Sequence, residues 1–162
     1  MKKTSLFTLL AGVLFLLFTG NNYAQKMTEF NWDSYHVKFQ IPVTFNVDKN
    51  VSDEFDAGDG DVYLSIYPKT GQSMTITSMK SALKDWASTS NVTYDNVNEM
   101  DNLNGYWGVY IDGTKSSNSL PATLLLLVHP DYTSTVLYIW INYKSDSFDT
   151  ALKMLKSFTP TY

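Results

Sequence analysis

The chain of 162 residues contains no cysteine and no arginine. Without cysteine it can form no disulfide, no thiolate-bound metal site, no cysteine nucleophile and no lipid anchor on a cysteine. Without arginine it lacks the side chain that holds phosphates and guanine edges through paired hydrogen bonds, and its formal net charge of -4 repels a polyanion. We therefore expect no nucleic-acid partner.

The first 24 residues have the pattern of a secretory signal peptide. Two lysines precede an uncharged, mainly apolar run, Leu6–Phe18. A membrane span needs about 20 apolar residues, so the shorter run predicts a cleaved leader, with an uncleaved membrane anchor as the alternative. We place the cut between Ala24 and Gln25. Asn22 stands where a small residue is preferred, which leaves a cut a few positions away open.

Residues 25–162 are long enough to form one domain with its own core. Removing residues 1–24 takes away two lysines and no carboxylate, so the formal net charge moves from -4 to -6. The apolar run Leu124–Val128 is too short to span a membrane. We expect a single, soluble, exported domain that is periplasmic or extracellular.

Hydrophobic periodicity predicts an α+β chain with three strands, a helix, four strands and a second helix. The short connections imply an antiparallel sheet of about six or seven strands flanked by the two helices. Leu124–Val128 is apolar without alternation, which is typical of a central strand covered on both faces. The predicted strands after the first helix are Val92–Glu99, Gly105–Thr114, Ala122–His129 and Ser134–Tyr143, the segments 37–41, 45–47 and 62–66 precede it, and the helices span 78–88 and 148–155.

Two short segments carry a family resemblance. HVKFQIPVTFNV at residues 36–47 and ALKMLKSF at residues 151–158, with the helix SMKSALKDWA between them, resemble the PsbP-like family and its bacterial relatives of the DcrB type. That superfamily also includes a Ran-binding nuclear transport factor. The resemblance covers about residues 30–160 and implies an α/β/α sandwich. It implies no catalytic residues, and members of the family act largely by binding other proteins.

The two histidines, His36 and His129, have no second ligand at helical spacing, and no serine follows the G-x-S-x-G pattern. We interpret both histidines as solvated or turn-capping residues. Ser65 and Ser134 lie in or beside ordinary strands. We therefore predict no catalytic, cofactor-binding or metal-binding residues and no cofactor.

The segment 53–61 is the densest charged feature. Its five carboxylates are Asp53, Glu54, Asp56, Asp59 and Asp61. Carboxylates on a flexible loop can bind calcium, but Gly58 stands where an EF-hand needs a ligand and no glutamate follows at the twelfth position. The sequence favours a solvated acidic hairpin that discourages edge pairing over a weak calcium site.

Aromatic residues recur on the same strand faces, in the pairs Tyr63 and Tyr67, Tyr106 and Tyr110, and Tyr138 and Trp140. If their strands adjoin, they form a surface that can bind a peptide, a glycan or a lipid tail. The alternative, which we favour because the sheet needs covering, is that the helices bury them.

These observations predict a non-enzymatic, exported module that binds a protein partner or associates with the cell envelope. A small-ligand carrier or a hydrolase-type enzyme that uses the aromatic sheet surface is the alternative. A third hypothesis is a purely structural protein of the cell envelope.

Overall fold

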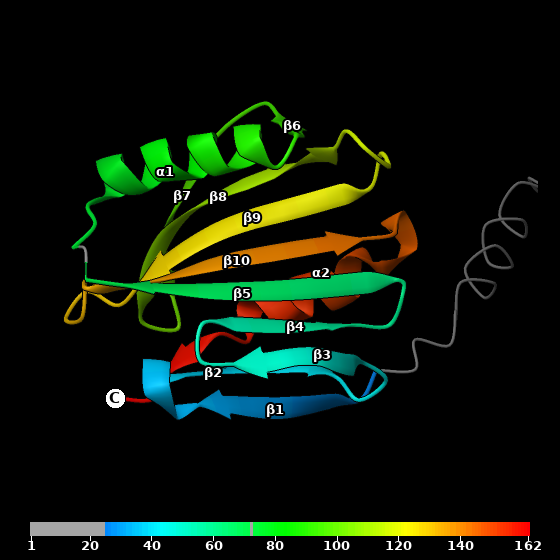
Figure 1. The fold of residues 1–162 in the computed structure, drawn as a ribbon, viewed down its shortest axis with the longest axis horizontal. Coiled ribbons are helices and arrows are strands. Elements are labelled where there is room, and N and C mark those ends of the chain that lie inside the picture. The colour runs from blue at the N-terminus through cyan, green and yellow to red at the C-terminus, as the bar shows by residue number, and fades with distance from the viewer. Residues whose placement is uncertain (1–24, 72) are drawn as a thin grey trace, which may run out of the picture.

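The computed structural model describes residues 25–71 and 73–162. The predicted leader, residues 1–24, lies outside the described residues. Two antiparallel sheets and two α-helices make up the described part of the chain (Figure 1). The described elements have the α+β composition with antiparallel sheets that the sequence predicts.

Eight strands form the large sheet. Their order is β3-β4-β5-β10-β9-β8-β6, and β7 pairs with β8 beside β6. Each neighbouring pair is antiparallel. The bounds are β3 Asn46–Val51, β4 Glu54–Gly58, β5 Val62–Thr70, β6 Val92–Tyr94, β7 Asn98–Leu103, β8 Tyr106–Lys115, β9 Pro121–Val128 and β10 Thr135–Tyr143.

A second sheet of three strands lies against one face of the large sheet. It contains β1 (Met27–Trp32), β2 (Val37–Pro42) and β11 (Thr159–Pro160), in the order β1-β2-β11. Phe39 of β2 stacks on Phe158, with 5.3 Å between ring centroids, and meets Phe55 of β4 edge-on at 5.0 Å. These contacts join the small sheet, Phe158 after α2 and strand β4 of the large sheet in one hydrophobic cluster.

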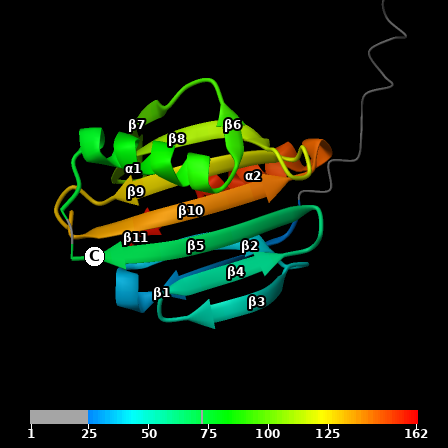
Figure 2. The same cartoon turned by 45° about the horizontal axis from the view of Figure 1, so that its top comes forward.

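The two helices lie on opposite faces of the large sheet. Helix α1 (Ile76–Thr89) buries Met79, Leu83 and Ala87 on one face, whereas α2 (Phe148–Lys156) buries its apolar side on the other face beside the small sheet. Figure 2 shows α1 above β8 and β9, with β3, β4 and β5 extending past it.

Strand β9 has the predicted central position. Leu125 and Leu127 belong to the cluster under α2, and Leu124, Leu126 and Val128 to the cluster under α1. All five are at most 1% exposed, so the run without alternation does reflect a strand covered on both faces.

Helix α1 begins at Ile76, two residues before the predicted start, with Thr75 as its N-cap. The Thr75 side chain accepts a hydrogen bond from the Ser78 backbone N–H at 3.2 Å, and Ser78 Oγ accepts one from the Thr75 N–H at 2.9 Å. This reciprocal capping box satisfies two N–H groups at the helix start. At the other end of the fold, Lys153 and Lys156 occupy the last turn of α2, where cations favour the helix dipole.

The structure corrects several sequence predictions. The strand expected over Val92–Glu99 is two strands, β6 and β7, which pair with opposite halves of β8 because the chain turns between them. In the segment 45–47, Phe45 is buried as its pattern predicts, but Asn46 and Val47 begin the edge strand β3, whose residues are all exposed. Strands β1 and β11 were not predicted, and the total exceeds the expected six or seven. The acidic strand β4 is covered by β3 and therefore protects no edge.

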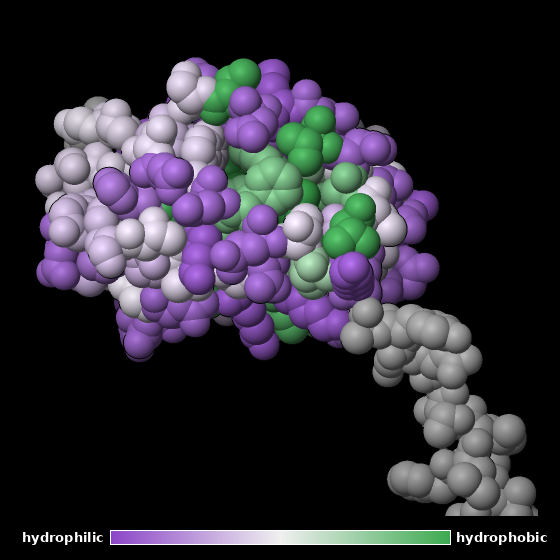
Figure 3. Space-filling model, turned by 90° about the horizontal axis from the view of Figure 1, so that it is seen from below, coloured by the Kyte–Doolittle hydropathy of each residue, from purple (hydrophilic) through white to green (hydrophobic). Residues whose placement is uncertain are grey.

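Polar side chains dominate the outside of the edge strand β3, but Val47 and Val51 are 41% and 48% exposed. Seen from below, this side of the molecule shows green apolar side chains among purple hydrophilic ones (Figure 3). Neither described helix is long and apolar enough to cross a membrane.

Candidate functional site

Strands β5 and β10 bring aromatic side chains together on the sheet face that α1 partly covers. Their antiparallel register sets three pairs of residues opposite one another: Tyr67 and Tyr138, Ser65 and Trp140, and Tyr63 and Asn142. Residues two apart on a strand share a face, so these six side chains form one two-strand surface. Two of the three predicted aromatic pairs therefore do adjoin.

Helix α1 adds a fifth ring, Trp86. Its ring centroid lies 5.3 Å from that of Tyr138, 6.1 Å from that of Trp140 and 6.5 Å from that of Tyr67, in edge-to-face arrangements. Such contacts stabilise aromatic pairs beyond the area they bury. We call the five rings of this surface the aromatic groove: Tyr63, Tyr67, Trp86, Tyr138 and Trp140.

The groove is open on both sides of Trp86. One hollow of about 400 Å³ includes Ser65, Lys115 and Asn142, and a second of about 430 Å³ includes Lys69, Asp85 and Thr89. Four of the five rings are half-buried, and only Trp140 counts as buried, at 9% exposure. The helix therefore covers the aromatic surface incompletely, which differs from the fully buried arrangement that we favoured from the sequence.

Polar groups hold the groove floor in place. Trp140 Nε1 donates a hydrogen bond to Asn142 Oδ1 at 2.8 Å, which fixes the indole against the sheet. The Lys115 ammonium lies 5.4 Å from the centroid of the Trp140 ring, within the range of a cation–π interaction. The groove thus offers flat apolar rings edged by hydrogen-bonding and charged groups.

A carboxyl group lies beside the groove on the same sheet face. Asp56 of β4 is opposite Ser65 in the register and is only 7% exposed. Its burial raises the pKa of the carboxyl above its ordinary value, and the neighbouring Glu54 raises it further, whereas a Ser65 hydrogen bond opposes the shift. Burial and the negative charge of Asp56 together raise the pKa of Tyr63. Asp56 Oδ1 has no hydrogen-bond partner.

The third predicted aromatic pair lies elsewhere. Tyr110 is opposite Leu125 in the β8–β9 register and belongs, with Tyr106, to the cluster under α2. Tyr106 is 3% exposed, and burial raises its pKa well above the ordinary value. The aromatic residues therefore lie on both faces of the large sheet. The single surface that we considered from the sequence does not extend to β8.

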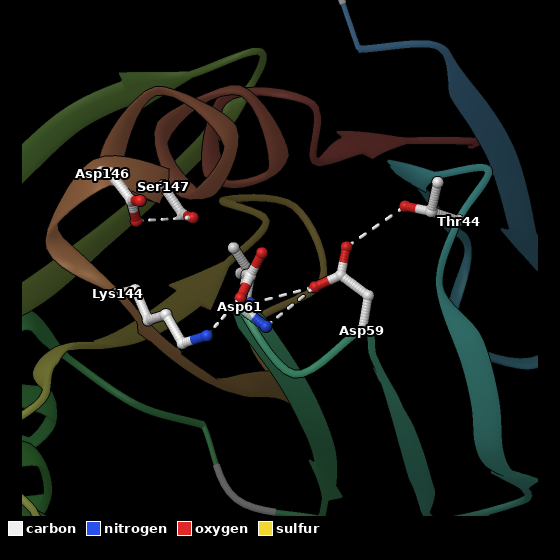
Figure 4. Close-up of polar contacts among 7 residues, drawn as sticks. Thr44, Asp59, Asp61, Lys144, Asp146 and Ser147 are labelled. Atoms are coloured by element: carbon white, nitrogen blue, oxygen red, sulfur yellow. Dashed lines mark hydrogen bonds and ion pairs between the residues drawn. The ribbon is translucent and has the colours of Figure 1, made fainter.

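The acidic segment 53–61 does not converge on a common point. Asp59 Oδ1 accepts hydrogen bonds from the backbone N–H groups of Asp61 and Val62, at 3.1 and 3.2 Å, and its other oxygen accepts one from Thr44 (Figure 4). Asp61 pairs with Lys144 at 2.5 Å. These contacts make Asp59 a turn cap and Asp61 an ion-pair partner.

The remaining carboxylates of the segment have separate environments. Glu54 pairs with Lys49 at 2.6 Å, which lowers the pKa of Glu54. Asp53 is exposed, whereas Asp56 is buried on the groove face of the sheet rather than solvated. In residues 25–71 and 73–162, no three histidine, aspartate or glutamate side chains are placed to hold a metal ion. The solvated hairpin that we expected is therefore wrong for Asp56.

The rings of both histidines contact the ring of Tyr162. The Tyr162 ring lies 4.7 Å from His36, 4.8 Å from His129 and 3.7 Å from Tyr132, measured between centroids. The Asp131 backbone N–H donates to His129 Nδ1 at 3.2 Å, so His129 caps the turn after β9. His129 contacts Tyr106 on the sheet face opposite the groove. His36 lies near it, because both histidines contact Tyr162, so both are away from the groove. Ser65 is in the groove floor, and the Ser134 carbonyl accepts from Gly71 N–H.

Comparison with solved structures identifies the fold. Cyanobacterial PsbP (CyanoP) from Synechocystis superposes with a TM-score of 0.61 at 14% identity, over 84% of this chain and 93% of that one. The Saccharomyces cerevisiae Ran-binding protein Mog1p gives 0.57 at 8% identity, over 85% and 96%. The chain has the PsbP-like fold. LpqN of Mycobacterium tuberculosis, which is involved in cell envelope biogenesis, gives 0.52 at 15% identity, over 85% and 91%.

These similarities establish the PsbP-like fold and no more specific role. No protein-family model and no curated protein sequence matches the chain. The aromatic pairs of β5 and β10 could be found from the sequence, but the contribution of Trp86 from α1 could not, because it depends on where the helix crosses the sheet.

Proposed function

We propose that the chain is a non-enzymatic, exported module that binds another protein through the aromatic groove. The observation that supports it is a set of four half-buried rings around a fifth, buried one, on a sheet face that α1 leaves partly open. Tyrosine and tryptophan are over-represented among the residues that dominate binding energy at protein interfaces. Their rigid rings gain contact area with little loss of conformational freedom.

Export rests on the pattern of the first 24 residues. Two lysines and the apolar run Leu6–Phe18 precede the proposed cut after Ala24. All described elements begin at or after Met27, so removal of the leader would leave both sheets and both helices complete. A protein processed in this way meets its partner outside the cytoplasm, in the periplasm or beyond the cell.

A binding role also fits the chemistry around the groove better than catalysis. Of the acids at the groove, Asp56 is buried and Asp85 is an exposed residue of the second hollow with no histidine beside it in that lining. His129 contacts Tyr106 on the opposite side of the sheet. A general acid or base must reach the reacting group to within hydrogen-bond distance. The rings, Ser65, Asn142 and Lys115 instead supply stacking surfaces and fixed hydrogen-bonding groups, which suit recognition.

Matched tyrosine variants test this proposal. Tyr67→Ala removes a ring of the groove, and Tyr132→Ala removes a 46% exposed ring that stacks on Tyr162 outside the groove. The amount of protein that co-purifies with the parent should fall about tenfold or more with Tyr67→Ala, which is the effect of removing an interface hot spot. It should be unchanged with Tyr132→Ala. Equal recovery with both variants, or no protein above background with the parent, would contradict protein binding at the groove.

A further inference from the structure

Helix α2 leaves a cavity between itself and the large sheet. Its volume is about 290 Å³, and its walls come from α2, β7, β8, β9 and β10. Leu125 forms part of the floor, Leu152 and Leu155 line the helix side, and Met100 and Leu103 of β7 close the third side. This space lies on the face opposite the aromatic groove, because Leu125 belongs to the cluster under α2. Small-molecule sites in proteins are typically concave and mostly apolar in this way.

One end of the cavity is closed by side chains that satisfy one another. Thr123 Oγ1 donates a hydrogen bond to Asp112 Oδ1 at 2.7 Å, and Tyr143 lies beside them with its pKa raised by burial. Phe148 is 51% exposed at this end and lies 6.0 Å from the Tyr143 ring. The Asp112 carboxylate that accepts this bond has no lysine within ion-pair distance among the described residues, so this end of the cavity carries a negative charge that disfavours an anionic head group.

The other end of the cavity is basic. Lys156 lines the cavity and also a neighbouring hollow that contains Lys38 and Lys153. Lys38 pairs with Glu29 at 3.6 Å, but no carboxylate of the described residues lies within ion-pair distance of Lys153 or Lys156. In a chain with 16 carboxylates and 12 lysines, this is a local excess of positive charge. An anionic group at this end would therefore be attracted.

We propose that this cavity binds a single-chain anionic amphiphile, such as a fatty acid, with its alkyl chain under α2 and its head group at Lys153 and Lys156. A volume of about 290 Å³ holds roughly ten non-hydrogen atoms, if each takes about the 30 Å³ that a water molecule occupies in the liquid. The apolar walls match the chain, and the lysines match the head group. This site is separate from the aromatic groove and does not depend on its function.

A chain-length series on purified residues 25–162, which contain every described element, tests the proposal. Hexanoate, octanoate, decanoate and dodecanoate are titrated calorimetrically at concentrations below micelle formation. Affinity should rise about fourfold for each added methylene group and level off near ten carbons, when the cavity is full. No binding of decanoate at millimolar concentration, or an increase without a plateau, would overturn the cavity assignment.

Variants separate the chain from the head group. Leu152→Trp adds a larger side chain to the half-buried helix wall and should abolish decanoate binding. Lys156→Glu should weaken it about threefold or more, whereas the same reversal at the exposed Lys84 of α1 should have no effect. Decanol should bind less tightly than decanoate. Equal affinity for decanol, or equal effects of the two lysine variants, would overturn the role of the basic end.

A groove variant keeps this test independent of the proposed protein binding. Tyr67→Ala lies on the opposite face of the sheet and should leave the affinity for decanoate unchanged. A loss of decanoate binding in Tyr67→Ala would place the amphiphile in the groove and overturn the cavity proposal. Circular dichroism of Leu152→Trp checks that the variant is folded, and if it is not, the result for Lys156→Glu decides the outcome.

Discussion

At the scale of single residues, the environment of Asp56 is the least expected feature. Strand alternation predicts that the two carboxylates of β4, Glu54 and Asp56, share a face, but it cannot predict that this face is covered at Asp56. Lys49 of β3 and Ser65 of β5 are its neighbours in the register, and burial raises the pKa of the carboxyl. A buried, ionised carboxylate without a full set of hydrogen bonds destabilises the folded chain.

This residue predicts a pH dependence of stability. Because the pKa of Asp56 is higher in the folded chain than its ordinary value of 3.8, the folded chain keeps the proton to higher pH. The free energy of unfolding therefore falls as the pH rises between the two values. Asp56→Asn should remove this fall, so the variant should gain stability relative to the parent between about pH 3.5 and pH 7.

Urea unfolding at the two pH values measures this difference. The exposed Asp53→Asn is the matched control and should track the parent. Asp56→Asn that loses stability relative to the parent as the pH rises would show that the ionised carboxylate stabilises the fold, contrary to the burial argument.

At the scale of elements, α1 decides how much of the groove is open. The helix starts at the capping box of Thr75 and Ser78. It packs against the sheet through Met79, Leu83 and Ala87. Both could be read from the sequence as a cap residue followed by helical spacing. The angle at which the helix crosses the sheet could not, because it depends on which strands adjoin beneath it.

The cap predicts a modest loss of stability. Thr75→Ala removes the acceptor for the Ser78 N–H and should lower the free energy of unfolding by about 1 kcal/mol. Thr77→Ala, in the exposed first turn, keeps the capping box and should change the free energy of unfolding by less than about 0.5 kcal/mol. Chemical denaturation of the two variants measures both values. Equal losses would mean that the box adds nothing beyond helix propensity.

The elements also show why part of the topology escaped sequence analysis. The alternating segment that contains Val37, Phe39 and Ile41 predicts a strand correctly, but nothing local shows that it joins a separate sheet. That placement depends on Phe158, more than a hundred residues later in the chain, which stacks on Phe39. Likewise β6 and β7 look like one strand until β8 supplies partners for each. Local patterns thus predict elements, whereas distant contacts select their neighbours.

At the scale of the whole molecule, the small sheet and the large sheet share one hydrophobic cluster. Phe158 is fully buried between Phe39 of the small sheet and the residues under α2. Removing a buried phenylalanine ring costs about 3–5 kcal/mol, so Phe158→Ala should lower the unfolding midpoint strongly. Phe148→Ala, at a 51% exposed ring, should cost much less.

The shared cluster also predicts a single unfolding transition. Near- and far-ultraviolet circular dichroism should report the same midpoint for the parent and for Phe158→Ala, because the two sheets lose their core together. Two separated transitions, with the small sheet lost first, would show that the sheets are independent units.

The central claim is that the aromatic groove contacts a partner protein. Site-specific photo-crosslinking in the producing cells tests it most directly, with a photoreactive phenylalanine derivative at position 67 in the groove and, as control, at the exposed position 132. We predict discrete adducts of higher mass from position 67 that are weak or missing from position 132. No adduct from position 67, or the same adducts from both positions, would contradict the claim.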